Sequence, residues 1–186
     1  MERTLVLIKP DGVERALIGK IISKFEDTGL KVVAIKIVKP GKDVVSQHYI
    51  EDKAWMEGVG NKTIKSQEAQ GIKVKETALQ IGQRVRAALM DYLTGQPVVA
   101  MVIEGNEAIA MVAKITGATS PVRADPSTIR GAYSSDSYDL ADSKKRAVKN
   151  IIHASDAKAT AEREIKVWFT TKEIIDYKRA DEGAMY

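Results

Sequence analysis

The chain has 186 residues, 44% of them hydrophobic and 29% charged, a length and balance typical of one folded domain with a sizeable core. It contains no cysteine, which excludes disulfides, thiolate catalysis and cysteine-based zinc sites. The net charge is only +4, and no apolar run approaches the ~20 residues that cross a bilayer, so the composition does not predict a membrane protein.

The N-terminal residues predict a strand, a tight turn and a helix. Residues 4–8 are β-prone and end at the turn signal Lys-Pro-Asp-Gly of residues 9–12. Apolar residues then recur at helical spacing over 18–25, and Gly29 is a suitable C-cap. Because no signal-peptide pattern precedes these elements, we expect a cytoplasmic protein.

A second strand is predicted over residues 31–38, where polar and apolar residues alternate. The alternation places Val33, Ile35 and Ile37 on the same side of this strand. A short helix is expected to follow, over residues 43–49.

The middle of the chain predicts a loop and then a long helix. Residues 58–76 are polar, contain glycine and show no clear period, so we expect a loop with some local structure. A helix is predicted over 77–94, with Thr77 as its cap and Gly95 at its end. The buried face of this helix is expected to consist of four residues at helical spacing, Ile81, Val85, Leu89 and Tyr92.

The positive charge of the chain is concentrated between Val59 and Met90, where six basic residues stand against two acidic ones. The rest of the chain is therefore formally neutral. The segment has no aromatic residue on which a nucleic-acid base would stack. We expect a solvated charged face here rather than a nucleic-acid interface.

The second half of the chain predicts two more strands and two more helices. The strands are expected at 97–103 and 150–152, and the helices at 106–115 and 157–168. Residues 132–147, rich in Ser, Asp and Lys, predict a second surface loop. The whole order of elements suits a ferredoxin-like α/β sandwich, in which a four-stranded antiparallel sheet carries helices.

The chain has only two histidines, His48 and His153. A lone histidine is more often structural than catalytic, but His153 ends a short apolar strand and precedes a helix. Such a junction presents side chains to ligands and places helix N-terminal amides near an anion. Glu164 lies on the same helix, in a position to orient the imidazole.

Several segments, in one order along the chain, resemble the motifs of the nucleoside diphosphate kinase family. They are IKPDGV at 8–13, QHY at 47–49, GQPVVAM at 95–101, PSTIRG at 126–131, and NIIHASD at 150–156 with AEREI at 161–165. The resemblance extends from about residue 3 to residue 177. It implies a single domain over 1–186 with two insertions, at about 58–90 and 132–149.

The resemblance implies an enzyme that transfers the γ-phosphate of a nucleoside triphosphate to a nucleoside diphosphate. In this family the reaction is ping-pong and passes through a phosphohistidine. Mg²⁺ is implied as the ion that bridges the nucleotide phosphates, and ATP and other nucleotides are implied as substrates. Family members form tetramers or hexamers, so a homo-oligomer is expected, whereas nucleic acid and membranes are not expected as partners.

Four of the matching positions imply the catalytic group. His153 resembles the nucleophile that accepts the γ-phosphate, and a neutral imidazole is competent for this near its ordinary pKa of about 6.5. The residues implied to surround the histidine are Tyr49, Ser155 and Glu164.

The other matching positions imply nucleotide contacts. Lys9 and Arg130 resemble the cations that hold the phosphates and stabilise transition-state charge. Thr119 resembles a hydroxyl donor to phosphate, and Asn150 a residue that contacts the ribose and phosphate region. Trp55 falls where the family places the aromatic residue that stacks on the base.

Two positions depart from the family pattern. Ala113 stands where an arginine is usual, with Lys114 beside it, and lysine is not an equal substitute for a bidentate arginine. Ala154 stands where glycine is usual, and it fits only if the backbone there keeps a negative φ. Ala113 leaves open a nucleotide-binding regulator with weakened catalysis. The basic segment leaves open a nucleic-acid-binding module.

Overall fold

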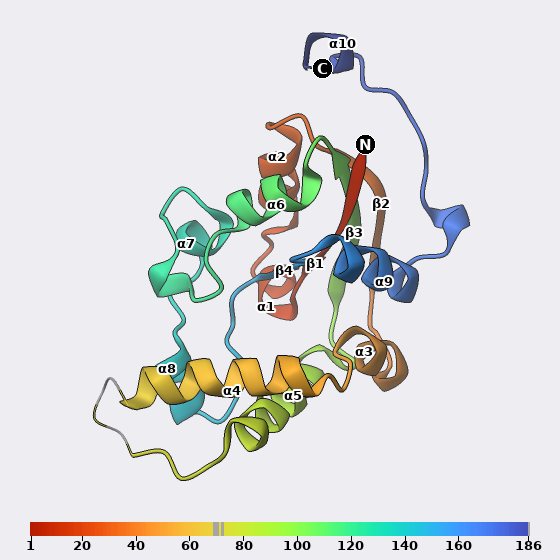
Figure 1. Cartoon of the computed structure of the whole chain (residues 1–186). Helices are drawn as coiled ribbons and strands as arrows, with labels where there is room; N and C mark the ends of the chain where they lie inside the picture. Colours follow the sequence, from red (N-terminus) through yellow and green to blue (C-terminus); the bar gives the residue numbers. More distant parts are fainter. Residues whose placement is uncertain (69–70, 72, 186) are drawn as a thin grey trace.

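Four strands form one antiparallel sheet in the order β2-β3-β1-β4, which confirms the predicted ferredoxin-like topology (Figure 1). The strands are β1 (Glu2–Ile8), β2 (Lys31–Val38), β3 (Val98–Gly105) and β4 (Ile152–Ala154). The structure is a computed structural model, and it describes residues 1–68, 71 and 73–185.

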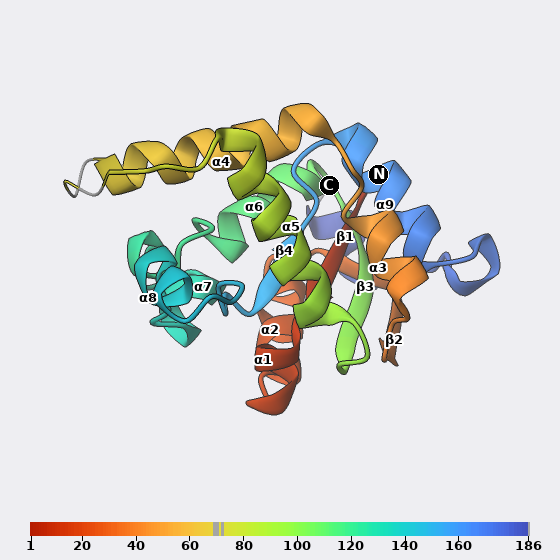
Figure 2. The same cartoon turned by 90° about the horizontal axis from the view of Figure 1, so that it is seen from below.

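Helices cover both faces of the sheet (Figures 1 and 2). The helices packed against one face are α2 (Ile18–Glu26) and α6 (Ala108–Thr116). Those packed against the other face are α3 (Lys42–His48), α5 (Ala78–Leu93) and α9 (Lys158–Trp168). Shorter elements are α1 (Pro10–Glu14), η1 (Pro121–Arg123), η2 (Thr171–Glu173) and α10 (Glu182–Met185). None of the described helices combines the length and apolar character that a bilayer crossing requires.

The central strand β3 contributes side chains to both hydrophobic cores. Val99 and Met101 belong to the core under α2 and α6, whereas Val98 and Ala100 belong to the core under α3 and α9. All residues of β3 are buried. Burial on both faces explains why the sequence here is apolar without alternation.

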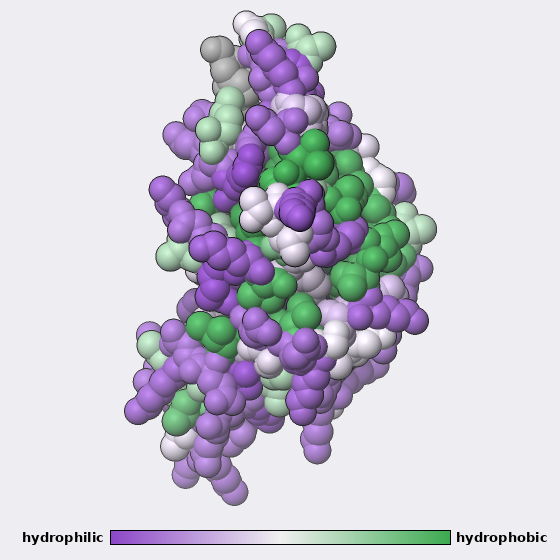
Figure 3. Space-filling model, turned by 90° about the vertical axis from the view of Figure 1, so that its right-hand side faces the viewer, coloured by the Kyte–Doolittle hydropathy of each residue, from purple (hydrophilic) through white to green (hydrophobic). Residues whose placement is uncertain are grey.

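In the edge strand β2, the prediction that Val33, Ile35 and Ile37 share one side is wrong. A bulge between Val32 and Ala34 shifts the register with β3, so Val33 packs in the core under α3 and α9 while Ile35 faces the opposite side. The side chains of Ile35 and Ile37 remain 50% and 68% exposed. Figure 3 shows the side of the molecule that carries β2, where apolar surface is bordered by polar surface.

The prediction of a loop over 58–76 is wrong, because α4 (Lys53–Glu68) occupies most of this range. Of this predicted loop, residues 69, 70 and 72 lie outside the described part of the chain. α4 packs on α5 through glycines: a Cβ on Gly60 would lie 1.9 Å from the Ala78 carbonyl oxygen, and one on Gly82 would lie 2.1 Å from the Met56 carbonyl oxygen. Because α4 is held by backbone contact rather than by a stripe of apolar side chains, its sequence lacks the helical spacing of apolar residues that would have predicted it.

The helix predicted over 77–94 is confirmed as α5, with the capping box formed between Thr77 and Gln80. The predicted burial of its face is only partly right. Ile81 is buried, but Val85, Leu89 and Tyr92 are half-buried. A helix that lies at the edge of the sheet, beside α4, has a narrower buried side than the spacing suggested.

The loop expected over 132–147 instead contains α8 (Tyr138–Ser143), and its first residues belong to the end of α7 (Ile129–Tyr133). Asp136 and Arg146 close it with two hydrogen bonds of 2.6 and 3.0 Å. On α8, Asp142 lies 3.9 Å from the Arg84 guanidinium and accepts a hydrogen bond from Gln67 at 3.5 Å. The two segments expected as insertions therefore contact each other, and α8 lies beside α4 in Figure 1.

Candidate active site

The backbone before His153 is in an unusual conformation. Ile151 has a φ of +71°, and the Ile152 N–H donates to the Asn150 carbonyl at 2.7 Å, which closes a three-residue turn. For a β-branched residue the left-handed region is an outlier that costs about 1–3 kcal/mol. β4 therefore begins at Ile152, not at Asn150, and His153 lies inside the strand opposite Leu7.

The His153 imidazole is oriented by Glu164, as the sequence suggested. Its Nε2 lies 2.8 Å from Glu164 Oε2, and the buried Ser155 hydroxyl donates to the same oxygen at 2.6 Å. Burial opposes ionisation of Glu164, but hydrogen bonds from His153 and Ser155 prevail and lower the pKa of Glu164 to about 2. The carboxylate holds Nε2, so Nδ1 is the nitrogen available to act as a nucleophile.

His48 was not predicted to belong to the site, yet its ring lies 4.5 Å from that of His153, nearly perpendicular to it. Its Nδ1 accepts a hydrogen bond from Trp168 at 3.4 Å and lies 3.6 Å from Glu164 Oε1. Burial, followed by the proximity of His153, lowers the pKa of His48 well below its usual range. A neutral His48 therefore packs against the His153 imidazole. The sequence did carry a signal for His48, which lies in the matched segment QHY at 47–49 beside Tyr49.

Tyr49 and Arg163 complete the surroundings of Glu164. The Tyr49 ring lies 4.6 Å from that of His48, and burial, then the Glu164 charge, raises the pKa of the Tyr49 phenol. Arg163 donates to the Gln47 carbonyl at 2.8 Å and lies 3.2 Å from Glu164 Oε1. The end of α3 is thereby tied to α9.

Lys9, Asn150 and Thr119 are brought together although they are distant in sequence. The Lys9 ammonium donates to Asn150 Oδ1 at 2.8 Å, and the Asn150 amide donates to the Thr119 carbonyl at 2.8 Å. Lys9 is only 5% exposed. Burial, then the Arg130 charge, lowers the pKa of Lys9 to about 8. A weakly solvated cation of this kind gains from an incoming phosphate.

Arg130 is anchored directly beside the strand of His153. Its guanidinium donates to the Gly117 carbonyl at 2.7 Å and to the Ile152 carbonyl at 2.9 Å, while its buried Nε has no partner among the described residues. Burial lowers the pKa of Arg130 to about 10, which leaves the group charged at neutral pH. An unpaired N–H in such a place is suited to an anion.

Four positions singled out in the sequence lie outside this network. Trp55 lies in the first turn of α4 with 39% of its surface exposed, and its stacking role stays a prediction. Ala113 and Lys114 are exposed on α6, on the turn that precedes Thr119. Ala154 lies within β4, where extended backbone accepts alanine without strain.

The site does not offer a resident position for Mg²⁺. Within residues 1–68, 71 and 73–185, the one group of three metal-binding side chains is His48, His153 and Glu164. Mg²⁺ prefers oxygen ligands in an octahedral arrangement, whereas this group supplies two imidazoles and one carboxylate. This donor set therefore does not suit Mg²⁺ as a directly bound ion.

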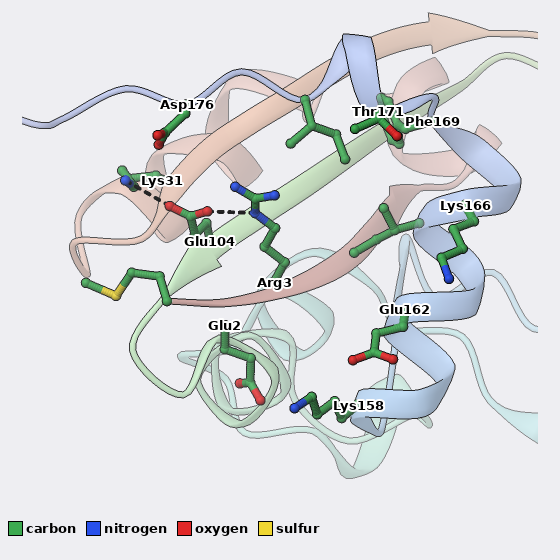
Figure 4. A pocket seen from close by; sticks show the side chains of 13 residues that line it. Glu2, Arg3, Lys31, Glu104, Lys158, Glu162, Lys166, Phe169, Thr171 and Asp176 are labelled. Atoms are coloured by element: carbon green, nitrogen blue, oxygen red, sulfur yellow. Dashed lines mark hydrogen bonds and ion pairs between the residues drawn. The ribbon is translucent and has the colours of Figure 1, made fainter.

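A separate pocket lies between the start of β1, α9 and the C-terminal segment (Figure 4). None of the candidate site residues lines it. Its dominant feature is Glu104, which lies 2.7 Å from Arg3 and 2.9 Å from Lys31. Glu182 also contacts Lys31, at 3.0 Å, so this ion-pair cluster fastens the C-terminal segment to the sheet.

Comparison with known proteins agrees with the geometry. A family model described as nucleoside diphosphate kinase matches residues 2–58 and 59–174. A nucleoside diphosphate kinase of Pyrobaculum aerophilum is 41% identical over 181 residues, covering 95% of this chain and 99% of the relative. The crystal structure of an NDP kinase from that organism superposes with a TM-score of 0.90 at 40% identity, covering 94% and 99% of the two chains. A transition-state mimic of the Borrelia burgdorferi enzyme, with bound vanadate and ADP, gives 0.82 at 36% identity, covering 98% and 95%.

An oriented imidazole flanked by buried cations suits transfer of a phosphoryl group, and the similarity extends over nearly the whole chain. The protein is a phosphotransferase that acts on nucleotides. More narrowly, the chain belongs to the nucleoside diphosphate kinase family. It transfers the γ-phosphate of a nucleoside triphosphate to a nucleoside diphosphate.

Proposed function

We propose that His153 carries the phosphoryl group between the two nucleotides. The lone pair of Nδ1 attacks the γ-phosphorus, an N–P bond forms, and the bond to the β-phosphate oxygen breaks, so the nucleoside diphosphate leaves with that electron pair. A second nucleoside diphosphate then attacks the phosphohistidine through its terminal oxygen and regenerates the imidazole. The observation that carries this proposal is the 2.8 Å contact of Nε2 with Glu164, which leaves Nδ1 as the reactive nitrogen.

The surrounding residues have complementary roles in this proposal. Lys9 and Arg130 stabilise the charge that spreads over the transferring phosphoryl oxygens. Asn150 holds the Lys9 ammonium and contacts the ribose and phosphate region, and the Thr119 hydroxyl donates to phosphate. Trp55 provides a face for the base, which favours broad base acceptance because stacking reads little of the base edge.

The metal and the assembly are also part of the proposal. Mg²⁺ enters as part of the nucleotide substrate, bridging its phosphates, with few direct protein ligands. The enzyme works in the cytoplasm, in keeping with a chain that has no cysteine. It forms a homo-oligomer, a tetramer or hexamer, and the exposed Ile35 and Ile37 of β2 are apolar side chains that such an assembly would cover.

The test of the His153 role is a labelling experiment. Protein incubated with ATP labelled in the γ-phosphate should acquire acid-labile, alkali-stable phosphate that leaves when an unlabelled nucleoside diphosphate is added. His153→Ala should lose both label and turnover while nucleotide binding through Lys9 and Arg130 persists. His48→Ala, which removes the neighbouring imidazole, should retain the label, because His48 does not carry the phosphate in this proposal. Phosphoryl transfer by the His153→Ala protein would refute the mechanism.

The basic segment gives little support to nucleic-acid binding. Arg84 pairs with Glu76 at 3.2 Å, and Arg86 pairs with Glu51 at 3.2 Å and donates to the Tyr49 carbonyl. These two arginines are therefore engaged within the fold, whereas the four lysines of the segment, Lys62, Lys65, Lys73 and Lys75, are exposed. An affinity for DNA or RNA that falls steeply with salt would contradict this interpretation.

A further inference from the structure

The strained turn at Ile151 is held by residues that follow β1. The Asp11 carboxylate accepts the Ile151 N–H through Oδ2 at 3.0 Å, and the Lys9 N–H donates to the Ile151 carbonyl at 2.7 Å. Gly12 allows the close approach, since a Cβ there would lie 3.1 Å from Cγ2 of Ile151. The backbone N–H and C=O of Ile151 are thus both held from the start of α1.

The Asp11 carboxylate is in turn fixed by a residue of α5. The Tyr92 hydroxyl donates to Asp11 Oδ1 at 2.6 Å, and the Asp11 N–H donates to the Tyr92 oxygen at 3.3 Å. Asp11 is 5% exposed, so its carboxylate is shielded from water, while Tyr92 is half-buried. Burial, then the Asp11 charge, raises the pKa of the Tyr92 phenol, which keeps it a donor.

β4, which carries His153, is a short strand, held besides its pairing with β1 by the Arg130 contact with the Ile152 carbonyl. The strand has three residues and pairs only with β1 in the described structure, with His153 opposite Leu7. The direction in which the chain enters this short strand therefore depends on the turn that precedes it. A small rotation at Ile151 would move the imidazole away from Glu164, and a displacement near 1 Å can reduce a rate by about 100-fold.

We propose that Asp11 and Tyr92 are a positioning pair, which holds the left-handed turn at Ile151 and thereby aims the His153 imidazole at the phosphate. Neither residue touches the reacting atoms in this arrangement. The pair also connects α5, the helix that adjoins the first insertion, to the nucleophile. The inference rests on the proposed role of His153 and adds the residues that set its geometry.

The test uses Tyr92→Phe, which removes only the hydroxyl. In a single turnover with Mg²⁺-ATP, the rate of phosphohistidine formation should fall by about tenfold or more, while the dissociation constant for ADP changes by less than about twofold. Asp11→Asn should also slow the step. Because Tyr92 acts on the turn through Asp11, the double variant should be little slower than the slower single variant.

Tyr177→Phe is the matched control, because it removes a phenol that donates to the Val32 carbonyl at 3.3 Å, in the C-terminal segment. It should keep the wild-type rate, and thermal unfolding of all variants shows that each is folded at the assay temperature. A wild-type rate in Tyr92→Phe, or additive effects in the double variant, would overturn the positioning pair. Absence of labile phosphate from the wild-type protein would instead refute the role of His153.

Discussion

Burial lowers the pKa of Lys9, the buried cation proposed to bind phosphate. Its folded pKa of about 8 lies below the ordinary value of 10.5, so the folded protein binds fewer protons than the unfolded chain between these values. Burying Lys9 therefore destabilises the fold below pH 8, and this penalty declines as the pH rises from about 8 to about 10.5. A bound phosphate would offset this cost, because its negative charge stabilises the buried ammonium.

This burial predicts the pH dependence of the enzyme. kcat/KM reports groups of the free enzyme, so it should decline as the pH rises through about 8, where Lys9 loses its proton. kcat should decline at higher pH, because bound phosphate raises the pKa of Lys9. Steady-state kinetics from pH 6.5 to 9.5 would measure both. A Lys9→Met variant should have low kcat/KM throughout, and a flat wild-type profile would contradict the prediction.

Ala113 predicts a gain of affinity on substitution. It is exposed on α6 where the family usually has an arginine, and an added guanidinium would supply a charge-assisted phosphate contact. Ala113→Arg should lower KM for nucleotide by about three- to tenfold, with kcat changed less. Ala110→Arg, one turn earlier and also exposed, is the control. An unchanged KM would mean that another cation, with Lys114 foremost, already makes the contact.

At the scale of elements, the contact between α4 and α5 depends on two glycines that have no room for a side chain. Gly60→Ala and Gly82→Ala should each destabilise the protein by about 1–3 kcal/mol, because the new Cβ meets backbone of the other helix. Gly58→Ala is the matched control on α4, since a Cβ there meets nothing within 4 Å. It should stabilise by up to about 1 kcal/mol through helix propensity. Urea unfolding distinguishes these signs.

The half-buried face of α5 gives a milder expectation for Leu89 than full burial would. A fully buried leucine replaced by alanine loses about 2–5 kcal/mol, so Leu89→Ala should lose about 1–2 kcal/mol of unfolding free energy. Ile81→Ala, from the buried start of the same helix, should lose more. A change at Leu89 within ±0.5 kcal/mol would place this face in solvent. A loss as large as that of Ile81 would mean that Leu89 is covered in an assembly.

At the scale of the whole molecule, the exposed side chains of β2 predict association. Ile37 is 68% exposed on an edge strand, so Ile37→Glu has little reason to destabilise an isolated chain. In a homo-oligomer that buries β2, the same change places an unpaired charge in an apolar interface. Sedimentation should show a wild-type mass that is a multiple of 20.4 kDa and a smaller mass for Ile37→Glu. Equal masses for the two proteins would show that β2 does not form part of the interface.

Much of the fold was determined by local signals in the sequence. The apolar run of β3, the capping box at Thr77 and the glycine at residue 29 marked elements that the structure contains in the same order. Each signal arises within a few residues, from burial, capping or backbone conformation, so it can be recognised before the chain is folded. The order of the elements then sufficed for the ferredoxin-like topology. The matched motifs likewise indicated His153, Lys9 and the other site residues.

Tertiary structure decided what those signals do not carry. The length of α4 depends on backbone contact at Gly60 and Gly82, which produces no apolar period, and the bulge in β2 reverses which side Ile35 faces. His48 joins His153 because α3 and α9 pack together. The left-handed Ile151 is held by hydrogen bonds from the start of α1, against the preference of a β-branched residue. Such contacts join segments far apart in the chain, so only the folded structure determines them.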